Sequence, residues 1–503
     1  MRNPISRRTF ALSAAVAPLA ASGLARAQAT SAWLHTSTPS FSLYGHVGER
    51  TLVQMAKDLE DFAGLLRSLH GVDASAGERP LPIYIVPRQT DLKRVRPGIT
   101  NVSGFYSASV GDIFAIISLE GDAERGRQVL FHEYTHHFMK RHAPAAYASW
   151  LVEGYAEYFS TALFKPDVVE LGRTSPRIAW LRGAVWTPFD RILGRRALTG
   201  NKFDITAFYA QSWLLTHYMM SDPARLARLT QYATAVAAGG DPVALMPQAA
   251  GVPLKDLERV LKQYMLALPG RRLPRPPSAA QALAVTRLPA SADDLLLENQ
   301  RLKMGVPPAE RPGLLAMIRE RAARYPGDRL AEMTLARVEN DYGDRAKAQG
   351  VLKQLISRDS RDVEALQTLG WSCMLQARTD PANAANFMRE AREWFGKGFA
   401  VDPDNALLLY DYGISRRGDA NYPNDNTVNV LLKAQALAPQ VPQFRIAAAD
   451  ALMRRDRFDE AAALVEPVFN DPHAGPQAAE AKRRFDEAIA RRKPAATSEE
   501  GDK

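Results

Sequence analysis

His132, Glu133 and His136 form an H-E-x-x-H array, and no other residues of this chain indicate chemistry as directly by their types and spacing. On a helix, residues four apart share a face, so both imidazoles can bind one metal ion while the glutamate addresses a metal-bound water. The array therefore predicts a hydrolytic zinc site with Glu133 as the base. The alternative is a pair of surface histidines on an amphipathic helix, and the surrounding sequence has to decide between the two.

A zinc site of this kind has three protein ligands and keeps the fourth position for water or substrate, so a third donor is needed. Glu153 and Glu157 lie four residues apart on a second predicted helix, residues 149–159, which is otherwise apolar. Burying a carboxylate on such a helix is costly unless a partner compensates for the lost hydration. Either glutamate could face the metal, depending on how the helix is rotated.

Residues 150–157, Trp-Leu-Val-Glu-Gly-Tyr-Ala-Glu, resemble the W-L-x-E-G-x-A stretch of aminopeptidase N-like zinc peptidases. Together with the H-E-x-x-H array, they make residues 45–270 similar to the compact, peptidase MA-like domains of the gluzincin clan. The resemblance implies that His132, His136 and Glu153 bind zinc and that Glu133 is the general base. It also implies that Glu157 orients a ligating histidine, as the corresponding acid does in thermolysin-like members.

The sequence departs from the family pattern in two places. Only sixteen residues separate His136 from Glu153, so the connecting loop around Pro144 must be short. A G-x-M-E-N string, which captures the substrate amino terminus in aminopeptidase N-like enzymes, is missing. Residues 113–120 stand in its place and are predicted to be an edge strand. Endopeptidase and exopeptidase action both remain open.

The elements around the array are consistent with an α+β zincin-like catalytic domain. Apolar residues recur with a helical period over residues 51–70. Strands are predicted at residues 81–86, 104–108 and 113–118, the last two joined by a turn at Gly111-Asp112. Residues 207–219 form an apolar helix that contains Tyr209. By the resemblance, Tyr209 is the candidate for stabilising the oxyanion, and the alternative is ordinary core packing.

The amino terminus is typical of an export signal. Residues 6–12 carry a twin-arginine pattern at Arg7-Arg8, followed by an uncharged, alanine-rich stretch and small residues up to Ala27. We expect residues 1–27 to be a signal peptide that sends the folded, metal-loaded protein to the periplasm. The apolar run is short for a membrane span, so no stable span is expected, although an uncleaved anchor remains the alternative.

Charge and cysteine content add less. The formal net charge is +9, and loss of the four arginines in residues 1–27 would lower it to +5. Short basic clusters are most simply solvated faces, and no nucleic-acid partner is expected. Cys373 is the single cysteine, so the chain cannot form an intrachain disulfide.

The second half of the chain has a different organisation. Residues 269–309 are rich in proline and arginine at their start and are predicted to be an extended linker. Loop signals then recur at Pro326, Ser360, Pro403, Pro439 and Pro472, close to the 34-residue period of tetratricopeptide repeats. We predict that residues 310–490 form an all-α solenoid of four such repeats, followed by a disordered tail at residues 491–503.

Two functions follow from these observations. The first is a periplasmic zinc-dependent peptidase that hydrolyses peptide or protein substrates, with repeats that recruit the substrate or a periplasmic partner. The second is a repeat-based scaffold or binding protein whose zincin domain is catalytically silent. The intact set of His132, Glu133, His136 and Glu153 favours the enzyme, because a base has no structural reason to stand beside the ligands.

Overall fold

The computed structural model describes residues 30–73, 78–100, 102–174, 177–194, 202–277, 282–469 and 476–492. The predicted signal peptide, residues 1–27, and residues 493–503 of the predicted tail lie outside the described residues. Among the described residues, no helix has the length and apolar character needed to cross a membrane.

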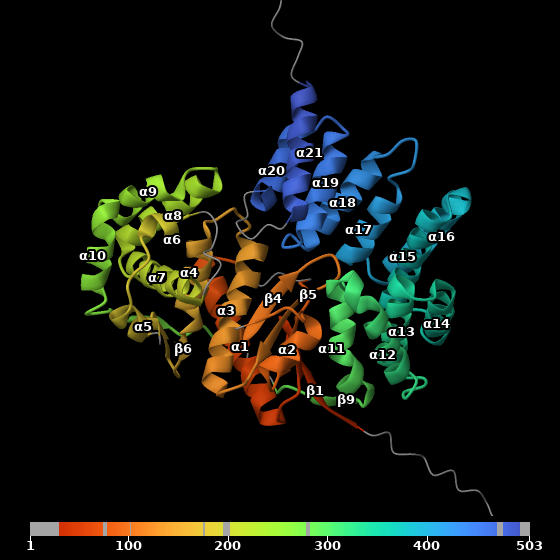
Figure 1. Cartoon of the computed structure of the whole chain (residues 1–503), viewed down its shortest axis with the longest axis horizontal. Coiled ribbons are helices and arrows are strands. Elements are labelled where there is room, and N and C mark those ends of the chain that lie inside the picture. The colour runs from red at the N-terminus through yellow and green to blue at the C-terminus, as the bar shows by residue number, and fades with distance from the viewer. Residues whose placement is uncertain are drawn as a thin grey trace, which may run out of the picture.

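The amino-terminal half is built around a six-stranded mixed sheet (Figure 1). Its strand order is β4-β5-β3-β2-β1-β9, in which β3 runs parallel to β2 and β5 and the other pairs are antiparallel. The strands are β1 (Thr30–Ser37), β2 (Phe41–Gly45), β3 (Leu81–Val86), β4 (Gly104–Ala108), β5 (Ile113–Ser118) and β9 (Val285–Pro289).

Helices cover both faces of this sheet. Ile83 and Ile85 face one side with α1 (Glu49–His70) and α3 (Ala123–His142), whereas Tyr84 faces the other side with α2 (Gln89–Val95) and α11 (Ser291–Met304). Because both faces are buried, β3 and β5 are almost continuously apolar. The predicted helix at residues 51–70 and all three predicted strands are confirmed.

The prediction that residues 113–120 form an edge strand is wrong. β5 lies inside the sheet between β3 and β4, and β4 is the outermost strand. Both segments carry a strand pattern, but the order in which strands pair depends on contacts between distant residues, which the local pattern does not contain.

The remaining elements of this half are helices that lie to the left of α3 in Figure 1, and a small antiparallel sheet of order β6-β7-β8. They are α4 (Ser149–Ser160), β6 (Leu163–Phe164), β7 (Val168–Leu171), α5 (Arg177–Gly183), α6 (Phe189–Ile192), α7 (Lys202–Met220), α8 (Pro223–Ala237), α9 (Pro242–Ala250), α10 (Leu254–Tyr264) and β8 (Arg271–Pro274).

The prediction that residues 269–309 form an extended linker is also wrong. β8 joins the small sheet, β9 pairs with β1, and α11 packs its Leu296 and Leu297 against the large sheet. A proline-rich sequence favours extended backbone, and here that backbone pairs with strands more than a hundred residues earlier in the chain. Pro274 is compatible with this because β8 is an edge strand.

The predicted helical repeats are confirmed as four successive helix pairs, preceded by α12 and followed by α21. These helices are α12 (Arg311–Ala322), α13 (Arg329–Tyr342), α14 (Arg345–Arg358), α15 (Val363–Thr379), α16 (Ala384–Val401), α17 (Ala406–Ser415), α18 (Asp425–Leu437), α19 (Pro442–Met453), α20 (Phe458–Phe469) and α21 (Pro476–Arg492), with short 3-10 turns η1 (Pro308–Glu310) and η2 (Pro381–Asn383). Gly370 of α15 allows a close contact with α16, since a Cβ there would lie 2.4 Å from the Phe395 ring.

The repeats bend back over the amino-terminal half (Figure 1). At the turn between β4 and β5, Val110 packs in a cluster with Tyr410 of α17 and Phe444 of α19. Arg141 at the end of α3 donates a 2.8 Å hydrogen bond to the carbonyl oxygen of Leu437 at the end of α18. The first helices of the last two pairs therefore contact the chain's own sheet domain.

Gly154 allows α4 to approach α7 closely. A Cβ at this position would lie 2.3 Å from Thr216 Oγ1 and 2.5 Å from the Ser212 carbonyl oxygen. We expect Gly154→Ala to lower the free energy of unfolding by about 1–3 kcal/mol because two helices must separate. Gly64→Ala is the control, since a Cβ at Gly64 of α1 meets no atom within 4 Å and should raise stability by up to about 1 kcal/mol. Chemical denaturation distinguishes them, and equal shifts would contradict the packing argument.

Candidate metal centre

Helix α3 holds the H-E-x-x-H array rigidly. The helix begins at Asp122, whose carboxylate accepts a 2.7 Å hydrogen bond from the Arg125 backbone amide. Phe131 lies on its inner side and stacks on Phe62 of α1 with ring centroids 4.1 Å apart. The array therefore projects from a helix that is fixed by the domain core.

The three predicted ligands are brought together at one point. His132 Nε2 lies 3.0 Å from His136 Nε2 and 3.3 Å from Glu153 Oε2. His136 Nε2 lies 3.6 Å from the same carboxylate oxygen. Two consecutive helices, α3 and α4, thus converge to form a triangle of donor atoms.

This triangle fits a zinc ion. In tetrahedral coordination with bonds of about 2.0–2.1 Å, neighbouring ligand atoms lie about 3.3–3.4 Å apart. The three edges, 3.0, 3.3 and 3.6 Å, lie on both sides of that value. Two imidazole nitrogens and one carboxylate oxygen are also donors that zinc accepts. Without an ion, the same contacts would be hydrogen bonds within a polar cluster.

The electrostatics of the cluster favour a cation. Burial lowers the pKa of His132, but the hydrogen bond to Glu153 and the charges of Glu157, Glu133 and Glu153 outweigh this and raise it to about 9. Burial, the largest cause, raises the pKa of Glu133 to about 7, and the charges of Glu153 and Glu157 add to it while His132 opposes it. Three carboxylates around one imidazole therefore hold positive charge strongly, and a metal ion would supply it while leaving the imidazoles neutral.

Glu157 lies behind His132. Its Oε1 is 3.6 Å from His132 Nδ1, on the side of the ring opposite to the donor triangle. Arg177 of α5 donates to Glu157 from Nε at 2.7 Å and from a terminal nitrogen, and its guanidinium lies 5.1 Å from the centroid of the Tyr209 ring. Arg177 therefore fixes the carboxylate that faces His132, one of the predicted ligands. Arg177 was not among the predicted site residues, because its only signal in the sequence is a basic residue beside an apolar run.

Glu157→Ala is expected to weaken zinc binding about 10- to 100-fold, because it removes a group that orients a ligand and not the ligand itself. Glu153→Ala should abolish stoichiometric binding. Competition with a zinc-selective fluorescent chelator measures both, and Glu258→Ala on the surface of α10 is the control. If Glu157→Ala abolished binding and Glu153→Ala only weakened it, the roles of the two carboxylates would be exchanged.

Tyr209 of α7 also lies at this site. Its ring centroid is 6.4 Å from that of His132. Burial and the neighbouring carboxylates raise the pKa of the phenol far above its ordinary value, so it stays protonated and can donate a hydrogen bond. Other polar residues of α7 belong to the core, since Gln211 bonds the backbone of Thr187 and His217 bonds the Gly172 carbonyl oxygen.

The edge strand β4 runs beside the array. The backbone of Tyr106 lies close enough to the Glu133 carboxylate to oppose the rise in its pKa, and the Tyr106 hydroxyl lies 3.2 Å from His137 Nδ1. Tyr106 pairs with Ala115 of β5 on the opposite side of the strand. The outer edge of β4 is therefore the edge that faces the candidate metal centre.

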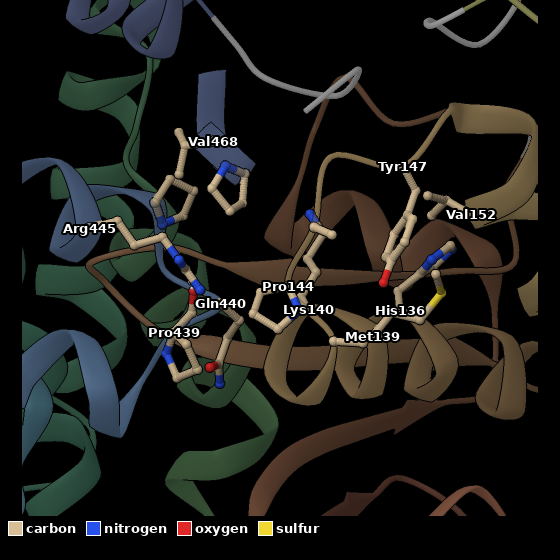
Figure 2. Close-up of a pocket in the computed structure, with 14 residues that line it drawn as sticks. His136, Met139, Lys140, Pro144, Tyr147, Val152, Pro439, Gln440, Arg445 and Val468 are labelled. Atoms are coloured by element: carbon tan, nitrogen blue, oxygen red, sulfur yellow. Dashed lines mark hydrogen bonds between the residues drawn. The ribbon is translucent and has the colours of Figure 1, made fainter. Parts of the chain in front are cut away.

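A pocket adjoins the centre (Figure 2). One wall is formed by α3, the loop that follows it and α4, and includes the predicted ligand His136 together with Lys140 and Tyr147. The opposite wall comes from the repeats and includes Gln440 and Arg445. This pocket was not predicted, because its walls come from segments about three hundred residues apart in the sequence.

No family model matches the chain, and no curated protein matches it. Solved structures similar to the chain include TTC0263, a thermophilic TPR protein of Thermus thermophilus, which is 22% identical with a TM-score of 0.34 over 40% of this chain and 100% of its own.

Two structures of MamA are also similar. One is 16% identical with a TM-score of 0.26, covering 36% of this chain and 92% of its own. The other, from Desulfovibrio magneticus, is 15% identical with a TM-score of 0.26, covering 41% and 97%. With TM-scores this low, the likeness says nothing about what this chain binds or does.

Proposed function

We propose that this chain is a zinc-dependent peptidase that acts in the periplasm after twin-arginine export. The observation that carries the proposal is the triangle of His132, His136 and Glu153 donor atoms with Glu133 beside it. The resemblance of residues 150–157 to zinc peptidases agrees with this geometry. Periplasmic action rests on the pattern at Arg7-Arg8.

The residues divide the chemistry among them. His132, His136 and Glu153 would hold zinc, which when bound supplies a Lewis acid that polarises the scissile carbonyl and acidifies a water. Glu133 takes the proton from the attacking water and delivers it to the leaving nitrogen. Tyr209, which stays protonated, donates a hydrogen bond to the oxygen on which negative charge develops.

A peptide is the substrate class that the edge strand favours. An extended peptide can add to the outer edge of β4 through main-chain hydrogen bonds, and this places its peptide bonds beside Glu133. Main-chain bonding selects an extended chain and does not depend on its side chains. Adjacent pockets would then set the sequence preference.

Digestion of a random peptide library by the full-length mature protein tests the proposal. We expect cleavage that a chelator removes and that about one equivalent of zinc restores. Mass spectrometry of the products identifies the cleaved bonds. Cleavage that survives chelation, or a zinc-loaded protein that cleaves nothing in the library, would contradict it.

A second function rests on the repeats. Four helix pairs form a surface of the kind that binds proteins, so the chain could act as a scaffold with a silent amino-terminal domain. Part of that surface already contacts the turn at Val110 through Tyr410 and Phe444. A scaffold would bind a protein partner with unchanged affinity when Glu133 is replaced, and the zinc-loaded chain would not hydrolyse peptides.

A further inference from the structure

The pocket beside the candidate metal centre is built by both halves of the chain. His136 lies on one wall, and residues 439–445 and 467–468 of the repeats form the other (Figure 2). The empty space within it, part of which opens to solvent, is about 650 Å³. Because the pocket opens to solvent, a ligand can enter it from outside.

Arg445 of α19 brings a buried positive charge to this pocket. The residue is only 6% exposed, and its guanidinium donates to the carbonyl oxygens of Pro439 at 2.7 Å and Leu464 at 3.3 Å. Within the described part of the chain, no carboxylate pairs with Arg445 and no acceptor contacts its Nη2. A buried cation with carbonyl partners alone is costly, and a carboxylate from outside the chain would compensate for that cost.

Gln440 adds a second polar group to the same wall. The residue is 7% exposed, and its Oε1 has no hydrogen-bond partner among the described residues. A buried amide oxygen needs a donor, and the backbone N–H of a peptide can provide one. The last residue of a peptide offers both groups, a carboxylate for Arg445 and an N–H for Gln440. An acidic side chain and its own backbone N–H offer the same pair.

We infer that Arg445 and Gln440 bind a carboxylate-bearing residue of the substrate in the pocket that leads to His136. That this ligand is a substrate rests on the proposed function, but its binding to Arg445 and Gln440 needs no catalysis. Apolar neighbours such as Pro439, Pro442 and Val468 lower the local dielectric constant and strengthen the ion pair. The repeats would then supply one wall of the substrate site.

Peptide retention on immobilised full-length Glu133→Gln protein tests this inference. The probe is a library of random, N-acetylated heptapeptides, made once as free acids and once as carboxamides, with zinc and after chelation. We expect acidic ligands to be retained about 10- to 100-fold better, as for a charge-assisted hydrogen bond. Enrichment of free acids identifies the terminal carboxylate, and enrichment of aspartate- or glutamate-containing peptides in both libraries identifies a side chain.

Two variants show which residues are responsible. Arg445→Met should remove the preference, and Gln440→Glu should do so without removing the bonds of Arg445 to Pro439 and Leu464. Arg454→Met is the control, because Arg454 is exposed on the same segment and pairs with Asp450. No preference for acids in the parent protein, or a preference that both variants retain, would overturn the inference. Because chelated protein is included, absence of zinc or of hydrolysis would not be mistaken for this result.

Discussion

Glu133→Gln is expected to leave zinc bound and to lower kcat/KM for peptide hydrolysis about 100- to 10,000-fold. The amide keeps the size of the side chain but cannot accept a proton from water, and general-base catalysis contributes a factor of this size. Zinc content and hydrolysis are measured on the same preparation. Glu124→Gln is the control, because Glu124 is on the same helix but is exposed and pairs with Arg127.

Measuring zinc content and hydrolysis together separates the role of a base from the role of a ligand. Loss of zinc with Glu133→Gln would place Glu133 among the ligands. Hydrolysis near the parent rate with zinc still bound would show that another group takes the proton.

His136→Ala and His132→Ala are each expected to abolish stoichiometric zinc binding. The two donors that remain in each variant cannot hold the ion against a chelator. The variant therefore loses the contribution of zinc binding to the free energy of unfolding. At a free zinc concentration a thousand times Kd, this contribution is about 4 kcal/mol. We therefore expect the parent protein with zinc to have a higher Tm than either variant.

Chelation supplies the matched comparison. It should lower the Tm of the parent protein and leave that of His136→Ala unchanged. His46→Ala, at an exposed histidine outside the cluster, should behave as the parent does. A zinc-dependent rise in Tm that persists in His136→Ala would place the ion elsewhere.

The candidate site could be predicted from local sequence to a large extent. The spacing of His132 and His136 on a helix, and two carboxylates on an otherwise apolar helix, follow from helical periodicity and from the cost of burying charge. The family resemblance added Tyr209 and the role of Glu157, and both side chains lie beside His132. Arg177 could not be predicted, because its contact with Glu157 depends on how α5 packs.

The parts that the sequence did not predict depend on contacts between distant residues. The order of β4 and β5 in the sheet is one example, and the pairing of β9 with β1 is another. Residues 269–309 have the composition of a linker, yet β8 joins the small sheet, β9 joins the large sheet and α11 covers one face of the large sheet. The pocket that contains Arg445 also depends on contacts between distant residues. The repeat pattern predicts the helix pairs, but it does not predict which surface of the amino-terminal half they pack against.

Anomalous X-ray diffraction at the zinc absorption edge, on crystals of the full-length mature protein grown with zinc, tests the central claim most directly. We predict one peak about 2.0–2.2 Å from His132 Nε2, His136 Nε2 and a carboxylate oxygen of Glu153. A map with no peak among these three side chains, or with the ion bound elsewhere, would contradict the assignment of this cluster as the metal centre.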